Sequence, residues 1–127
     1  MKKQAGLWID HRKAVIVLLT GKVEEIKSIS LEEERVSGTD SEKGWIEDVR
    51  DRHYENHLKS YYDEVIAVTR GSESILIFGP GEAKIELEKQ FKHEGLAKSI
   101  LAVETTDKMT VNQIAAKVRD RFKTEAE

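Results

Sequence analysis

The sequence predicts an α/β fold of three layers, with helices on both faces of a mixed five-stranded sheet. Three observations lead to this prediction: short apolar runs separated by tight turns at the start, one long amphipathic stretch in the middle, and alternating apolar runs and amphipathic stretches at the end. The element order is β-β-β-α-β-α-β-α, a meander followed by alternating helices and strands. A length of 127 residues suits a single domain over 1–127.

The first part of the chain predicts an antiparallel meander. The runs AGLWID (5–10), AVIVLL (14–19) and VEEIKSIS (23–30) are separated by the short polar turns HRK and TGK. The second run is fully apolar, whereas the third alternates imperfectly, which favours an edge strand.

The middle of the chain predicts a loop and then a long helix. Residues 31–44 are acidic and polar, contain two glycines and show no periodicity, which favours a flexible loop. From Trp45 to about Arg70, apolar residues spaced three and four apart predict one buried helical face. Gly71 supplies the stop signal. The stripe consists of Leu58, Tyr61, Tyr62, Val65, Ile66 and Thr69.

The last part predicts two strands and two helices. SILIFG (74–79) is a short apolar run between glycines, typical of a central strand buried on both faces, and SILAVE (99–104) predicts another buried strand. Amphipathic stretches at 82–94 and 110–122 predict helices, and the second opens on a Thr-x-x-Gln capping box.

Composition limits the classes of function. The chain has 21 basic and 24 acidic residues and a net charge of −3, so any nucleic-acid contact has to come from a local patch. The sequence contains no cysteine, which excludes disulfides, thiolate metal sites and a cysteine nucleophile, and fits the cytoplasm. The polar run at 10–13 interrupts the N-terminal apolar segment, which argues against a signal peptide, and no run reaches the ~18 apolar residues of a membrane span.

The segment HYENH (53–57) raises the possibility of a metal site. On a helix His53 and His57 share one face and could bind zinc. The zinc protease motif, however, has glutamate directly after the first histidine, where Tyr54 stands here. We favour two surface histidines on a polar helix face.

Asp10 and the segment FGPGEAK (78–84) each allow a functional and a structural interpretation. Asp10 could bind magnesium, but neither later strand offers convincing carboxylate partners, so a turn residue that binds nearby backbone amides is favoured. The glycine-rich turn could hold phosphate at a helix N-terminus, but it matches neither phosphate-binding motif and carries Glu82. A tight strand-to-helix connection is favoured.

Basic residues gather in three places. Arg12 and Lys13 lie at the predicted first hairpin tip, and the last helix is basic near its end, as the helix dipole favours. Along the long helix, acidic residues interleave with the basic ones, which is typical of ion pairing on a solvated face. These basic positions are Arg50, Arg52, His53, His57 and Lys59.

Three segments together carry a resemblance to a known family. GLWIDHRKAVIVLLTGKVEEI, RHYENHLKSYYDEVIAV and ESILIFGPGEAKIELEK resemble the first hairpin, the long helix and the strand–helix unit of the central domain of the eukaryotic and archaeal class 1 peptide chain release factor and its relative Pelota. The match covers about residues 5–122 and lies in the order and spacing of the segments. The resemblance implies a ribonuclease H-like fold, of the kind found in translational machinery components, here as a stand-alone domain.

The chain departs from this family in one segment. In release factors the loop before the long helix carries Gly-Gly-Gln, whereas the corresponding segment here, RVSGTDSEKGWIEDVRD, contains no glutamine. The resemblance therefore implies a module nearer to Pelota, without release chemistry, catalytic residues or a cofactor.

Three hypotheses of function follow. The first is a translation-associated module that binds the ribosome or tRNA in the cytoplasm. The second is a protein-interaction or homodimerisation module without a nucleic-acid role. The third and least favoured is a metal-dependent hydrolase. For a binding surface the sequence favours the loop at 37–44, the start of the long helix and the first hairpin tip: Trp45, Arg50, Arg52, His53, His57, Arg12 and Lys13.

Overall fold

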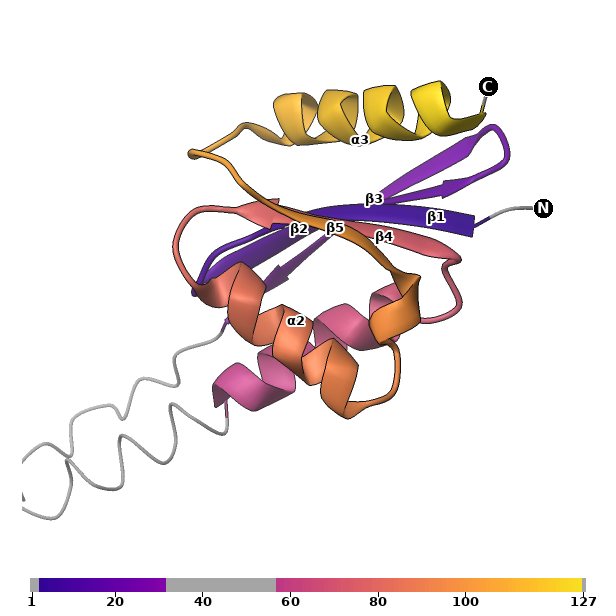
Figure 1. Ribbon diagram of the computed structural model, residues 1–127. Helices are drawn as coiled ribbons and strands as arrows, with labels where there is room; N and C mark the ends of the chain where they lie inside the picture. Colours follow the sequence, from indigo (N-terminus) through magenta and orange to yellow (C-terminus); the bar gives the residue numbers. More distant parts are fainter. Residues whose placement is uncertain (1–2, 32–56, 127) are drawn as a thin grey trace, which may run out of the picture.

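The computed structural model describes residues 3–31 and 57–126 (Figure 1). Its elements follow the predicted order. The predicted residues 45–56 of the long helix and most of the predicted loop lie outside the described residues. The elements are β1 (Lys3–Ile9), β2 (Lys13–Thr20), β3 (Val23–Ser30), a helix over 57–69, β4 (Ser74–Gly79), α2 (Ala83–His93), the short 3-10 helix η1 (Ala97–Ser99), β5 (Ile100–Thr105) and α3 (Val111–Ala126).

The five strands form one mixed sheet in the order β3-β2-β1-β4-β5. β1 and β3 pair antiparallel with β2, whereas β4 pairs parallel with both β1 and β5. The predicted ribonuclease H-like architecture is confirmed, as are the edge position of β3 and the central position of β4. The prediction of a buried strand at 99–104 is wrong in one respect. β5 is the other edge strand, with a single neighbouring strand, and its residues 100–104 are only half-buried.

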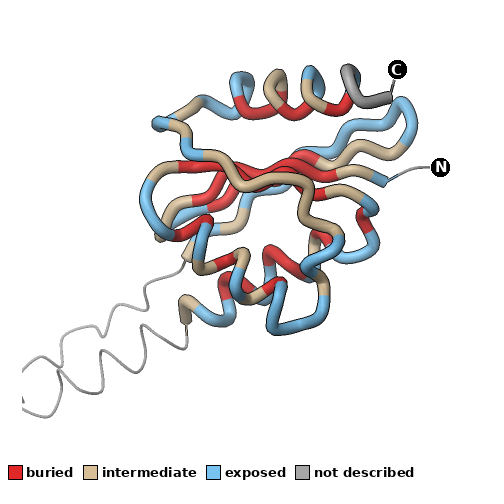
Figure 2. The backbone as a smooth tube through the Cα atoms, in the orientation of Figure 1, coloured by how far each residue is buried: buried red, intermediate tan, exposed pale blue. Residues whose placement is uncertain are grey.

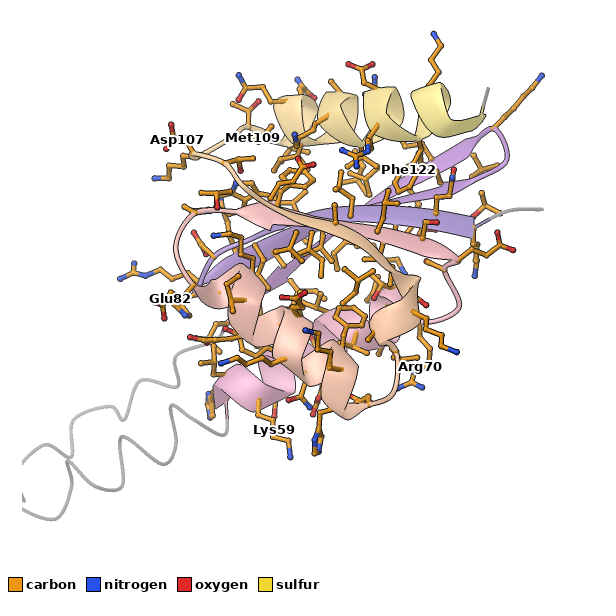
Figure 3. All side chains as sticks on the ribbon, viewed as in Figure 1. Lys59, Arg70, Glu82, Asp107, Met109 and Phe122 are labelled. Carbon is orange, nitrogen blue, oxygen red and sulfur yellow. The ribbon has the colours of Figure 1, made fainter. Side chains whose placement is uncertain are left out.

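Helices cover both faces of the sheet (Figure 1). α3 lies on one face, and α2 and the 57–69 helix lie on the other. Because side chains alternate across a strand, β1 feeds two separate cores. Leu7 and Ile9 pack toward α2 and the 57–69 helix, whereas Trp8 packs toward α3. Figure 2 shows the buried positions concentrated along the central strands and on the helix faces that meet them. Phe122 points from α3 toward the sheet and is buried (Figure 3).

Gly6 is the point at which α3 approaches β1 most tightly among the glycines of this face. A Cβ atom added to Gly6 would lie 2.4 Å and 2.8 Å from the two methyl carbons of Val118. On the sheet, Gly6 stands between Val17 of β2 and Leu76 of β4. A glycine at this position therefore lets the helix backbone settle closely on the central strand.

The two helix starts differ in how they are capped. At α3, the amide of Gln113 donates to Thr110 Oγ1 (3.1 Å) and the amide of Thr110 donates to Gln113 Oε1 (2.9 Å), so the predicted capping box is confirmed. Before α2 the glycine-rich segment forms the predicted tight connection. Gly79 has φ 152° and Gly81 has φ 65°, and a Cβ at Gly79 would lie 2.2 Å from the carbonyl oxygen of Ile9. Among the described helices, none is long and apolar enough to cross a membrane.

Candidate functional site

The carboxyl end of β1 leads into a tight turn whose shape depends on Asp10. Its Oδ1 accepts hydrogen bonds from the amides of Arg12 (2.7 Å) and Lys13 (2.8 Å), and its own amide donates to the Lys13 carbonyl (3.0 Å). The predicted role of Asp10 as a turn residue is confirmed. Within residues 3–31 and 57–126, no three His, Asp or Glu side chains gather closely enough to hold a metal ion.

Arg12 and Lys13 lie together at this turn, as predicted. Both are exposed, and the Lys13 ammonium lies 5.6 Å from the centroid of the Trp8 ring. The Arg12 carbonyl accepts a hydrogen bond from the amide of Leu31 (2.7 Å), which ties the turn to the end of β3. The two cations thus stand at the end of the sheet where the meander is completed.

A cavity of about 470 Å³ opens beside the turn, between β3 and the 57–69 helix. Leu31 and His57, the residues on either side of the segment 32–56, both line it. Tyr61, one helical turn after His57, donates from its hydroxyl to the carbonyl of Asp10 (3.0 Å). The hairpin tip and the first described turn of the helix therefore lie at the same end of the fold.

A second polar group fixes this end of the sheet to α2. His11 Nε2 lies 3.2 Å and 3.3 Å from the two carboxylate oxygens of Glu86, and the Tyr62 hydroxyl donates to Glu86 Oε1 at 2.6 Å. Glu86 lies in the first turn of α2, where the helix dipole favours a negative charge. The carboxylate thus joins three elements: the β1–β2 turn, the 57–69 helix and α2.

The chemistry available to this group is limited. Burial raises the pKa of the Tyr61 phenol far above its ordinary value, and the charge of Asp10 raises it further, so Tyr61 acts as a neutral hydrogen-bond donor. A histidine beside a carboxylate could move a proton. Here, however, the same carboxylate also accepts the Tyr62 hydroxyl, so Glu86 acts first as a clamp between elements.

On the opposite face, the basic side chains of α3 are engaged in ion pairs. Lys117 Nζ and Arg121 Nη1 lie 3.0 Å and 2.9 Å from the two oxygens of Glu104, and Arg119 Nε lies 2.6 Å from Glu24 Oε1. The hydrogen bond from Lys117, with the charges of Lys117 and Arg121, holds the pKa of Glu104 below its ordinary value against the effect of burial. These contacts leave the turn at Arg12 and Lys13 as the stronger candidate for binding polyanions.

Solved structures of translation proteins share this fold. The archaeal translation termination factor aRF1 superposes with a TM-score of 0.53 at 14% identity, over 98% of this chain and 40% of that one. The Pelota protein of Thermoplasma acidophilum gives a TM-score of 0.56 at 16% identity, over 97% of this chain and 32% of that one. The fold is release factor/Pelota-like. No protein-family model matches the sequence, and no curated protein does.

The release factor/Pelota-like fold spans only about a third to two fifths of those two proteins, and the low identity carries the fold alone. Of the residues proposed from the sequence, the structure brings Arg12, Lys13 and His57 to one end of the sheet. The others lie outside the described residues, so the proposed pairing of His57 across the helix stays a prediction. They are Trp45, Arg50, Arg52 and His53.

Sequence reasoning missed the group formed by His11, Tyr62 and Glu86. Glu86 is separated from Tyr62 by 24 positions and from His11 by 75, so no local spacing joins them. One signal was available: a tyrosine on a buried helical stripe needs a partner for its hydroxyl. The sequence showed that Tyr61 and Tyr62 share the stripe, but it could not show which acceptors face them.

Proposed function

We propose that this chain is a translation-associated module that binds the ribosome or tRNA and does not catalyse peptide release. The observation that carries the proposal is the fold similarity, which extends over nearly the whole chain to a protein named as an archaeal translation termination factor and to a Pelota protein. A ribosome-binding role also implies a cytoplasmic location.

The sequence of the segment between β3 and the 57–69 helix supports the non-catalytic part of the proposal. Glutamine occurs in this chain only at positions 4, 90 and 113, so the segment 32–56 cannot supply the Gly-Gly-Gln motif of release factors. Added to ribosomes that carry peptidyl-tRNA, the purified chain should release no peptide above the buffer control. Release that scales with the concentration of the chain would contradict this part.

The β1–β2 turn is the surface that we assign to RNA contact. Arg12 and Lys13 are exposed there, and the histidine at position 57 lines the neighbouring cavity. Phosphate binding by lysine and arginine releases counterions, so affinity falls as salt rises. A chain with a net charge of −3 can bind RNA only where such a patch faces away from its acidic surface.

Co-sedimentation with ribosomes at about 50 mM and 150 mM salt tests the proposal, since this range changes phosphate-dependent affinity strongly. The wild-type chain should sediment with ribosomes at the lower salt. The variant Arg12→Ala/Lys13→Ala should bind less and show a salt dependence that is flatter by about one to two contacts.

The matched control is Lys22→Ala/Lys98→Ala. It removes the same charge from exposed positions at the other end of the sheet, at the β2–β3 turn and in η1. This control should bind like the wild type. Failure of the wild type to co-sediment at the lower salt would refute the proposed function, and equal loss in both variants would refute the assigned surface.

A further inference from the structure

We propose that the free edge of β3 is a homodimer interface, in which two copies of this chain pair antiparallel through Val23–Ser30 and join their sheets. This inference does not depend on the proposed function. β3 is an edge strand, and all of its residues are exposed except Ile29, which is half-buried (Figure 2). An edge of this kind presents unpaired backbone groups that another strand can complete.

The apolar side chains of β3 are unusually exposed for a strand that stays unpaired. Val23 is 66% exposed and Ile26 is 41% exposed, so β3 carries two of the four large apolar side chains that are exposed within the described residues. The strand also contains charges, and edge charges commonly block indiscriminate pairing. The pattern of those charges decides which partner remains possible.

Symmetry limits how two identical strands can pair. In an antiparallel pair, opposite residues alternate between hydrogen-bonded and non-hydrogen-bonded positions. A two-fold axis must preserve this type, so one residue has to face its own copy. For β3 the longest such pairings involve residues 23–29, centred on Ile26, or residues 24–30, centred on Lys27.

Only the first of these two pairings is electrically complementary. Centred on Ile26, it sets Glu25 of each chain opposite Lys27 of the other and Val23 opposite Ile29, with the two Ile26 side chains in contact. Centred on Lys27, it sets the two lysines against each other. Opposite charges across a strand pair are favourable and like charges are not. Within one chain Glu25 and Lys27 already lie 3.3 Å apart, so their charges are on the same face of the strand.

The two faces of the sheet agree with this register. Ile26 pairs with Val17, which belongs to the core under α3, so the contact between the Ile26 side chains would extend the apolar surface of that face. Lys27 pairs with Ile16, whose side chain belongs to the other core. The charged pairs would therefore lie on the face opposite the Ile26 contact.

Sedimentation equilibrium from about 10 μM to 1 mM tests the proposal, because a paired edge of this size gives weak affinity. The wild type should approach twice the monomer mass as the concentration rises. Glu25→Lys and Lys27→Glu should each weaken dimerisation about tenfold or more, because each sets like charges opposite in the proposed register. Circular dichroism checks that both variants are folded.

Two combinations make the test specific for the register. Mixing the Glu25→Lys chain with the Lys27→Glu chain should restore dimers, because each lysine then faces a glutamate of the other chain. The double variant Glu25→Lys/Lys27→Glu should dimerise like the wild type. Glu73→Lys, which makes the same charge change in an exposed connection away from β3, is the matched control and should not alter dimerisation.

The outcomes that would overturn the proposal are equally specific. A wild-type chain that stays monomeric at the highest concentration excludes the dimer. Dimers that are unaffected by Glu25→Lys and Lys27→Glu place the interface elsewhere, and single variants that dissociate but fail to associate with each other exclude the register centred on Ile26.

Discussion

Replacing Gly6 by alanine tests how α3 is seated on the central strand. The added Cβ would lie 2.4 Å and 2.8 Å from the two methyl carbons of Val118 and 3.1 Å from its Cβ. Carbon atoms attract at separations of about 3.5–4.0 Å, so both methyl contacts would overlap by about an ångström. Valine in a helix strongly prefers one side-chain rotamer, and Val118 cannot easily turn both methyl groups away.

The magnitude follows from two opposing effects. Overpacking of a core costs about 1–3 kcal/mol. An alanine in place of glycine in a strand returns about 0.5–1 kcal/mol through backbone entropy. We therefore expect Gly6→Ala to lower the free energy of unfolding by about 1–2 kcal/mol. Urea denaturation followed by circular dichroism measures this difference, and an unchanged m-value shows that the unfolding transition is comparable.

A double-mutant cycle with Val118→Ala separates this contact from other effects. Val118→Ala alone should cost about 2 kcal/mol, because it removes two buried methyl groups. In the double variant the overlap is gone and the new methyl group fills part of the space, so it should be no less stable than Val118→Ala. The coupling should reach about 1–2 kcal/mol, well above the ~0.5 kcal/mol scatter of independent sites.

Gly71→Ala is the matched control for this cycle. A Cβ at Gly71 meets nothing within 4 Å, but the residue has φ 91°, so alanine there is strained by the backbone alone. Its effect should add to that of Val118→Ala without coupling. If Gly6→Ala proves neutral or stabilising, or if its effect simply adds to that of Val118→Ala, the close approach of α3 to β1 is incorrect.

Three further predictions follow from the polar contacts. Tyr62→Phe should lower the free energy of unfolding by about 1–2 kcal/mol, since it deletes a hydrogen bond to the charged Glu86, and combining it with Glu86→Gln should show a smaller loss than the sum of the two single changes. Glu104→Gln should cost about 1 kcal/mol near neutral pH. Because the folded-state pKa of Glu104 is lowered, that difference is present above the ordinary glutamate pKa of about 4.3 and should shrink as pH falls below it, so denaturation series at neutral and acidic pH should converge. Asp10→Ala should cost about 1–2 kcal/mol through the loss of two turn hydrogen bonds, whereas Asp10→Asn, which keeps a side-chain oxygen, should cost less in the same denaturation assay.

Local patterns predicted most of this fold because its elements carry strong local signals. The apolar run at 14–19, the helical stripe that contains Tyr61 and Val65, and the capping box at the start of α3 each specify structure through neighbouring residues. β5 shows where such signals end. Its apolar run at 100–103 indicates partial burial, but whether a strand has one neighbour or two depends on topology, and the prediction of a fully buried strand was wrong.

The candidate site was predictable only in part, for a related reason. Arg12 and Lys13 could be placed because a hairpin tip is a local feature. The contact of His11 with Glu86 joins the β1–β2 turn to the first turn of α2, and it exists only once β4 has paired parallel with β1 and brought α2 to that end of the sheet. Contacts of this kind follow from the assembled sheet and leave no spacing in the sequence.

The proposed site and the proposed dimer edge use different parts of one sheet, and the geometry relates them. The β1–β2 turn with Arg12 and Lys13 lies at the end of the strands, whereas Glu25 and Lys27 lie along the side of β3. A two-fold axis through the paired β3 strands reverses strand direction between the copies, so the two turns would point in opposite directions. One dimer could then offer its two turns only to separate ligands, and avidity for a single site is excluded. Glu25→Lys should accordingly dissociate the dimer without weakening ribosome binding per chain, whereas a parallel loss of both properties would mean that the two surfaces are not independent.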